Sequence, residues 1–493
     1  MNRTFSTVVA ACVIATLAVG AAAQTPEETQ SVVTLRVTAA APARPALKHA
    51  LLHDRAEMRP GDAAPLYFTA TLLAAQARAA GAGAAAAARA PGSGPPAAGA
   101  GENERLDRYL SADAAELERD RADAQALVVR YDSALHQVEL ATHRDSCRWE
   151  LSIREDGPNT LLPQLPELRT LARLLSLRAR LQILDRRYDD AAATLRTGMT
   201  LARHLGEQAV LVQSVFAAGV AELMLERAAE LAGSPGAPNL YWPLSALPQP
   251  FVDPVAPMQW ERSFVGFAVP DLARAARGEL PPEQWQVVWR SVRALATSNR
   301  AADDRAWDAD AVTSAVLAAK AYPAAKRSLI ASGVPAERVG ALPVAYVVGT
   351  YQFRRYQEWS DELWKGFVLP YPQGAGVISR AMRDMDRSEV EEGANPFTAL
   401  LPALNLTRLR LAQVDRSIAA LRVVEAVRAY AAENDGRLPD SLDDVKGLPL
   451  PSDPVSGKPF RFERTPDGAV LRAPRVPAEQ TSPSPRFEIT VTR

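Results

Sequence analysis

Apolar residues recur at helical spacing through most of the chain, and this pattern predicts a mainly helical protein. The clearest segment is Leu171–Gly206, where two amphipathic stretches are joined by the polar sequence DRRYDD, residues 185–190. Helical spacing continues to Gly233 and resumes after a proline-rich break, and seven of the eight tryptophans fall between Trp242 and Trp364. Aromatic residues at this spacing, such as Trp285 and Trp289, are expected to pack in a helical core.

Both ends of the chain carry strand patterns. Near the amino terminus, Val33, Leu35 and Val37 alternate with polar residues, which predicts one short strand. Near the carboxyl terminus, residues 458–473 predict a hairpin and residues 486–492 a third strand. These last strands predict a small antiparallel sheet.

A long helix is predicted before this hairpin, over Leu411–Asn434. Gly436 can take the left-handed conformation that ends a helix, and Ser441 with Asp444 forms a weakened capping box. Helix electrostatics therefore explain the acidic residues of this segment. The helix carries an apolar stripe made of Ile418, Leu421, Val424, Val427 and Ala431.

The helical pair at Leu171–Gly206 resembles one tetratricopeptide unit. Gln182 departs from the pattern, because it stands at the usual tyrosine position, and no clean second copy follows at the same period. The resemblance therefore implies a degenerate helical array rather than a regular solenoid. The residues that carry it are Ala179, Tyr188, Ala191, Leu195 and Gly198.

Residues 411–493 are similar to the globular part of pseudopilins, in which a helix is followed by an LP-containing segment, a DP-G-P turn and a closing hairpin. Pseudopilins begin with a membrane helix, whereas this module ends a long chain, so fibre assembly is not implied. Calcium binding, known in some pseudopilins, maps only onto Asp453. The matching residues are Tyr430, Gly436, Leu438, Pro439, Leu442, Asp453, Pro454, Gly457, Pro459, Phe460 and Phe462.

A broader resemblance covers most of the chain and is most specific over Leu161–Glu207. It is similar to a family of uncharacterised, predicted secreted bacterial helical proteins, in which the hairpin and the pseudopilin-like module occur together. The resemblance supports the architecture and brings no catalytic residue with it.

The first residues have the pattern of a secretory signal peptide. Arg3 precedes an apolar run that ends in Ala21, Ala22 and Ala23, which predicts cleavage before Gln24. The alternative is an uncleaved anchor, but the run is shorter than the roughly 20 residues that span a bilayer. We therefore expect a periplasmic or extracellular protein with no stable membrane anchor after cleavage.

The expected fold class is mainly α, a degenerate tetratricopeptide-like array with a small α+β module in which a long helix lies on an antiparallel sheet. The predicted parts are the signal peptide, an amino-terminal segment with a strand, a helix and a low-complexity insertion, the helical-hairpin region, a Trp-rich helical region and the pseudopilin-like module. Their ranges are 1–23, 24–104, 105–233, 234–404 and 405–493.

Composition narrows the possible partners. The chain has 56 basic and 57 acidic residues, so no nucleic-acid footprint is expected. Only six of the basic residues are lysine, an arginine excess that we attribute to coding bias. Signal cleavage would remove Cys12 and leave Cys147 alone, which excludes a disulfide within the chain.

Candidate chemistry is sparse. On a helix, His49, His53 and Glu57 would share one face and could bind zinc, but we expect ordinary, partly exposed histidines and no metal or cofactor. His143 and Cys147 could meet four residues apart on a helix, but a buried cysteine beside a tryptophan is the favoured alternative. The sequence has no HExxH motif, phosphate loop or GxSxG elbow, and we assign no catalytic residue.

Tyr241 and Trp242, in PNLYWPLSALPQP, are the predicted binding rim, because prolines expose a turn that carries two aromatic residues. The alternative is a loop whose aromatics cap the core.

Two functions remain open from the sequence. The first is a non-enzymatic interaction or scaffold protein of the periplasm or cell envelope, which binds an unidentified envelope protein. The second is an envelope hydrolase or small-ligand-binding enzyme whose site is assembled from distant residues.

Overall fold

The structure, a computed structural model, describes most of the chain, and the predicted signal peptide lies outside the described residues. No helix in the described part is long and apolar enough to cross a membrane. The described residues are 32–87, 100–156, 160–207, 210–276, 278–298, 311–398, 401, 404–476 and 486–491.

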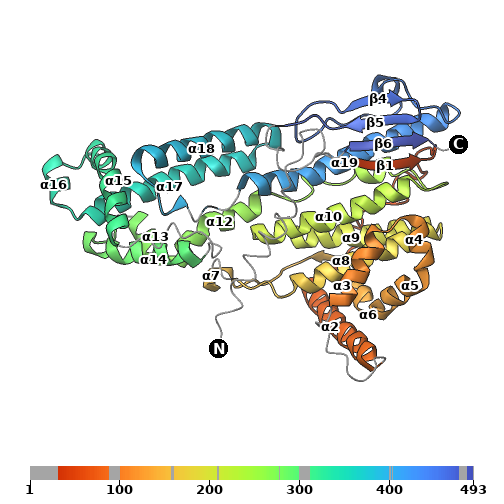
Figure 1. The fold of residues 1–493 in the computed structure, drawn as a ribbon, viewed down its shortest axis with the longest axis horizontal. Helices are drawn as coiled ribbons and strands as arrows, with labels where there is room; N and C mark the ends of the chain where they lie inside the picture. The colour runs from red at the N-terminus through yellow and green to blue at the C-terminus, as the bar shows by residue number, and fades with distance from the viewer. Residues whose placement is uncertain are drawn as a thin grey trace. The chain divides into compact units, whose positions relative to one another are not determined.

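The chain is mainly helical and has a small antiparallel three-strand sheet near its carboxyl terminus (Figure 1), which confirms the predicted fold class at this level. It divides into two compact units. The tryptophan-rich unit contains Leu151–Leu161 and Pro254–Arg408, and the sheet-containing unit contains Thr25–Glu150, Leu162–Asp253 and Leu409–Arg493.

The sheet-containing unit opens with short helices around α2, whose start is fixed by Asp62. The Asp62 carboxylate accepts hydrogen bonds from the backbone N–H of Ala64 at 3.0 Å and of Arg148 at 2.9 Å, so it links α2 to the short parallel pair β2 and β3. These elements are β2 (Arg59–Asp62), α2 (Ala64–Ala87), α3 (Ala100–Ser111), α4 (Ala114–Arg119), α5 (Arg121–Arg130), α6 (Asp132–Thr142) and β3 (Arg144–Ser146).

The two amphipathic stretches of the predicted hairpin form α8 (Leu165–Leu184) and α9 (Tyr188–Gly206), and α10 (Leu211–Ala232) packs against both. Gly198 of α9 lies directly against Met224 of α10. A Cβ at this position would lie 2.2 Å from Sδ of Met224, well inside van der Waals contact. A small residue at Gly198 is therefore needed for α10 to pack where it does.

The carboxy-terminal strands β4 (Arg461–Thr465), β5 (Gly468–Arg472) and β6 (Arg486–Val491) pair antiparallel, as predicted. The predicted amino-terminal strand, β1 (Val32–Val37), pairs in parallel with β6 and adds a fourth strand, in the order β1-β6-β5-β4. Val32 lies opposite Arg486, so the sheet joins segments from the two ends of the described chain.

The long predicted helix is α19 (Leu404–Glu433), and all five residues of its predicted stripe are buried. Gly436 has a φ of +78°, which confirms the predicted left-handed cap. Burial extends beyond the stripe, because Arg416 and Arg428 on the same helix are fully buried. Arg428 donates to the carbonyl of Thr38 at 3.0 Å and to that of Ala237 at 2.9 Å. Two distant loops are thereby fastened to α19.

The tryptophan-rich unit is built around α17, against which α14, α15 and α18 pack. Trp285 is buried, and a Cβ at Gly349 of α17 would lie 2.4 Å from its ring, so the expectation of core packing is confirmed for this tryptophan. The elements are α7 (Ile153–Asp156), α12 (Val255–Ala268), α13 (Pro270–Ala276), η2 (Pro282–Gln284), α14 (Trp285–Ser298), α15 (Ala311–Ala331), α16 (Ala336–Ala341), α17 (Val344–Val368) and α18 (Tyr371–Glu392).

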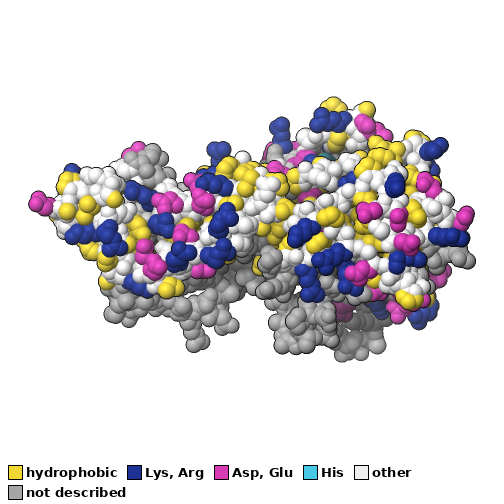
Figure 2. Space-filling model, turned by 90° about the horizontal axis from the view of Figure 1, so that it is seen from above, with side chains coloured by type: hydrophobic (Ala, Val, Ile, Leu, Met, Phe, Trp, Pro, Cys, Tyr) yellow, Lys and Arg dark blue, Asp and Glu magenta, His cyan; other side chains and the backbone are white. Residues whose placement is uncertain are grey.

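Charged side chains of both signs are interspersed on the face that Figure 2 shows. This distribution fits the near balance of 56 basic and 57 acidic residues.

Candidate binding site

The predicted rim residues lie on α11 (Tyr241–Ser245), a short helix that Asn239 fixes in place. The Asn239 side chain accepts a hydrogen bond from the backbone N–H of Tyr241 at 3.0 Å. It donates to the carbonyls of Ala40 at 2.9 Å and Glu425 at 2.8 Å. One buried amide thus holds α11 against both α19 and the amino-terminal segment.

Tyr241 and Trp242 differ sharply in exposure. The Tyr241 ring is buried against Ala426 and Val445, and its hydroxyl donates to the carbonyl of Pro449. Trp242 is 39 % exposed and meets the Tyr241 ring edge to face, with the ring centroids 5.1 Å apart. The structure therefore places Tyr241 in the core, where it supports a surface tryptophan.

An open cavity of about 300 Å³ lies beside Tyr241 in the same unit. Pro449, which accepts the Tyr241 hydrogen bond, belongs to its wall, as does Arg422, whose guanidinium carbon stands 5.7 Å from the centre of the Tyr241 ring. The cavity is lined by Gln249, Ala419, Arg422, Pro449, Leu450, Pro451, Ser452 and Pro454.

Arg422 is the only charged residue in this lining. Its Nε atom is buried and has no hydrogen-bond partner among the described residues. The buried acids of the neighbourhood are already engaged. The Glu425 carboxylate accepts from Arg428 at 2.8 Å, and the Asp415 carboxylate accepts from the backbone N–H of Phe251 at 2.8 Å. The cavity wall thus carries a positive charge that these acids do not neutralise.

Asp453, the residue onto which calcium binding was mapped, is fully buried and paired with Arg416. Both carboxylate oxygens accept from the guanidinium at 2.9 Å, and they also accept the backbone N–H groups of Val455 and Ser456 at 3.0 Å. Burial acts to raise the pKa of Asp453, but the hydrogen bonds and charge of Arg416, with those N–H groups, hold it below its usual value. The calcium hypothesis therefore has no free carboxylate at this residue.

The zinc-binding face that was considered and disfavoured for His49, His53 and Glu57 is not formed. Residues 45–58 make turns rather than a helix, and His49 bonds to Asp189 at 2.8 Å while His53 lies 4.1 Å from the ring of His143. Among the described residues, no group of three His, Cys, Asp or Glu side chains is arranged to hold a metal ion. The expectation of partly exposed histidines is also wrong for His49, which is 6 % exposed.

The disfavoured pairing of His143 with Cys147 on one helix is not formed either. Helix α6 ends at Thr142, and strand β3 intervenes before the cysteine. Cys147 and Trp149 are both buried, and burial raises the pKa of the thiol, with a further contribution from the Glu207 carboxylate. This agrees with the alternative of a buried cysteine beside a tryptophan.

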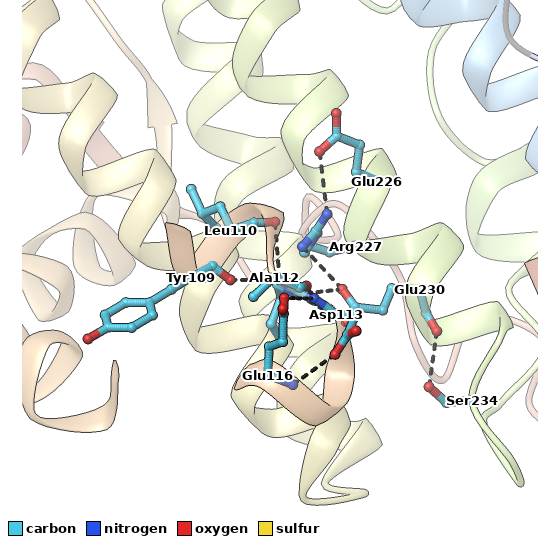
Figure 3. Close-up of polar contacts among 10 residues, drawn as sticks. Tyr109, Leu110, Ala112, Asp113, Glu116, Glu226, Arg227, Glu230 and Ser234 are labelled. Carbon is cyan, nitrogen blue, oxygen red and sulfur yellow. Dashed lines mark hydrogen bonds and ion pairs between the residues drawn. The ribbon is translucent and has the colours of Figure 1, made fainter. Parts of the chain in front are cut away.

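A cluster of arginine and glutamate side chains joins α3, α8 and α10. Arg180 donates to the backbone carbonyls at the end of α3 and to Glu230, while Figure 3 shows Arg227 between Glu226 and Glu230. The Arg180 bonds satisfy carbonyls that a helix end leaves unpaired. The cluster therefore fastens α3 to the hairpin. The carbonyls belong to Tyr109, Leu110 and Ala112.

The residues that sequence reasoning missed are Arg422, Gln249 and Ser452. They come from three separate segments, and the sequence offered no distinct signal for them, because Arg422 is one of several charged residues on α19. The resulting arrangement is an exposed tryptophan on a buried tyrosine, which in turn contacts the wall of a cavity with one guanidinium. Comparisons with protein-family models, curated proteins and solved structures found no match for this chain.

Proposed function

We propose that the chain is an exported, non-enzymatic interaction or scaffold protein of the periplasm or cell envelope, which binds another envelope protein at the surface around Trp242. The observation that carries this proposal is the support given to Trp242. This exposed side chain rests on the buried Tyr241 ring and lies on a helix held by Asn239. Rigid tryptophans in such positions are typical of the residues that dominate protein interfaces.

The helical architecture supports the same proposal. The packing of α10 on both α8 and α9, with Gly198 of α9 against Met224 of α10, is consistent with a degenerate tetratricopeptide-like array. Arrays of this kind commonly present extended protein-binding surfaces. The pseudopilin-like module would contribute through α19 and the loop Pro449–Pro454 that forms part of the cavity wall.

The alternative, an envelope hydrolase or small-ligand-binding enzyme, has one observation in its favour. His53 and His143 stand 4.1 Å apart, and Nδ1 of His53 lies 3.6 Å from the Glu57 carboxylate. The His53 side chain is only 5 % exposed, however, and burial, with the charges of His143 and Arg196, lowers its pKa to about 4. A neutral, covered imidazole favours a structural role for this pair.

Site-specific photocrosslinking in the native envelope tests the proposal. A benzophenone amino acid replaces Trp242 in the full chain, and a matched variant carries it at Val129, which is 63 % exposed in the same unit. We expect a defined protein adduct from position 242 and not from position 129. The purified partner should then bind the unmodified chain, with affinity at least about tenfold weaker for Trp242→Ala. Adducts of identical pattern from both positions, or none, would refute the proposal.

A further inference from the structure

The wall of the cavity beside Tyr241 carries an arginine, Arg422, that has no carboxylate partner among the described residues. Two of the buried arginines on α19 have carboxylate partners, Arg416 with Asp453 and Arg428 with Glu425. Arg422 lies between them on the same helix, and its described contact is with the Tyr241 ring. A guanidinium that is partly removed from water and lacks a counter-charge is costly, so an anion that reached it would be stabilised.

The other polar groups of the wall are also available. The side chains of Gln249 and Ser452 are exposed and make no hydrogen bond to another described residue, and both groups can donate. The prolines at 449, 451 and 454 have no N–H and fix the local backbone, so they give the wall an apolar, pre-organised surface. The cavity therefore offers one cation, two neutral polar groups and apolar sides.

We propose that this cavity binds a carboxylate group, with Arg422 as its counter-ion and Gln249 and Ser452 as further hydrogen-bond donors. The planar guanidinium matches a carboxylate in geometry, and a single positive charge suits a monoanion better than a phosphate dianion. A volume of about 300 Å³ is at the lower limit for small-ligand sites, which fits a carboxylate on a short apolar group. The carboxylate would be the group that the proposed binding surface recognises, so this inference rests on the proposed function.

A carboxylate of this kind has two sources, a free small organic acid or the carboxyl terminus of a partner chain. The test titrates isobutyrate, an N-acetylated tetrapeptide ending in valine, and the same tetrapeptide as its amide into the full mature chain, with binding measured by calorimetry. Binding of the acids and not of the amide is the expected result. A preference for the peptide acid identifies a chain terminus as the source, and equal binding of isobutyrate identifies a free acid.

Variants locate the binding in this cavity. Arg422→Gln should weaken binding of the acids at least about tenfold, because it removes a charged hydrogen-bond donor, while Arg422→Lys should retain part of it. The matched control is Arg437→Gln, which removes an exposed arginine of the same unit and should change nothing. If Arg422→Gln does not fold, Arg422→Lys and Ser452→Ala still report on the site.

The outcomes separate this inference from the proposed function. Absence of saturable acid binding, equal binding of acid and amide, or binding insensitive to position 422 would each overturn the carboxylate assignment. A partner that crosslinks at position 242 and binds equally well to Arg422→Gln would overturn it while leaving the interaction role in place. Acid binding without any crosslinked partner would support the assignment and refute the interaction role.

Discussion

Replacing Asp453 by asparagine removes the charge of a fully buried ion pair while keeping the shape of the side chain. Arg416 would then be buried without the carboxylate that now bonds to it twice at 2.9 Å. Removing one partner of a buried pair typically costs about 3 to 5 kcal/mol. Asp453→Ala also unpairs the backbone N–H groups of Val455 and Ser456, which adds about 1 kcal/mol each.

The assay is denaturant-dependent hydrogen exchange, followed by mass spectrometry in peptides from residues 409–433. It reports on the sheet-containing unit alone, which matters because the two units need not unfold together. Asp440→Asn is the control, because the Asp440 side chain is 96 % exposed, and it should change the free energy of unfolding by less than about 0.5 kcal/mol. In the double variant Arg416→Met/Asp453→Asn, most of the loss should be recovered.

At acidic pH the free energies of unfolding of wild type and Asp453→Asn should become more similar. The folded pKa of Asp453 lies below its unfolded value, so its stabilisation is complete above about pH 4 and is lost as the pH falls through the folded pKa. Millimolar calcium should leave the unfolding of the wild type unchanged, because Arg416 occupies the carboxylate. The reasoning would be refuted if Asp453→Asn lowered the free energy of unfolding by less than about 1 kcal/mol, or if calcium stabilised the wild type.

Three further predictions test the packing around α9. Gly198→Ala should destabilise the unit by about 1 to 3 kcal/mol in chemical denaturation, since its Cβ would overlap Met224, and the same change should cost less in a Met224→Ala background. Arg180→Met should cost about 1 to 3 kcal/mol and raise hydrogen exchange selectively in residues 100–111, because the carbonyls at the end of α3 lose their donor while Glu230 keeps Arg227. Burial lowers the pKa of His204 to about 4, so between pH 7 and pH 4 wild type should lose about 3 kcal/mol more stability than His204→Gln.

A specific result would contradict each of these three predictions. Additive effects of the Gly198 and Met224 changes would show that the two side chains do not meet. If hydrogen exchange in the Arg180 variant rose equally throughout the unit, Arg180 would have no specific role in holding the end of α3. Equal acid sensitivity of wild type and His204→Gln would show that this imidazole does not control the loss.

The sequence predicted what local patterns can encode. The stripe on α19 from Ile418 to Ala431, the cap at Gly436 and the three carboxy-terminal strands follow from spacing and turn chemistry, and the structure has them. The pairing of β1 with β6 could not be predicted from the sequence, because an alternating pattern identifies a strand but does not identify the strand that pairs with it. The arginine excess was attributed to coding bias, yet Arg416 and Arg428 are fully buried, and their partners lie in distant segments.

The candidate site shows the same limit. Tyr241 and Trp242 could be noticed as aromatics in a proline-rich loop, but their different exposure depends on contacts with Ala426 and Pro449 about 200 residues away. Arg422 reads in the sequence as one charge on a helix, and only the folded chain places Ser452 near it. A cavity formed by three segments has no local pattern.

From the parallel pairing of Val32–Val37 with Arg486–Val491 we expect a particular order of folding events. Strand β1 is synthesised long before β6 and cannot pair until β6 has been made. Contacts of such large sequence separation are formed late and at a high cost in loop-closure entropy. Until then β1 presents unpaired backbone groups, a state open to aggregation and suited to protection by a chaperone. Folding of this unit is therefore expected to be post-translational and slow compared with that of the locally connected helices of the tryptophan-rich unit.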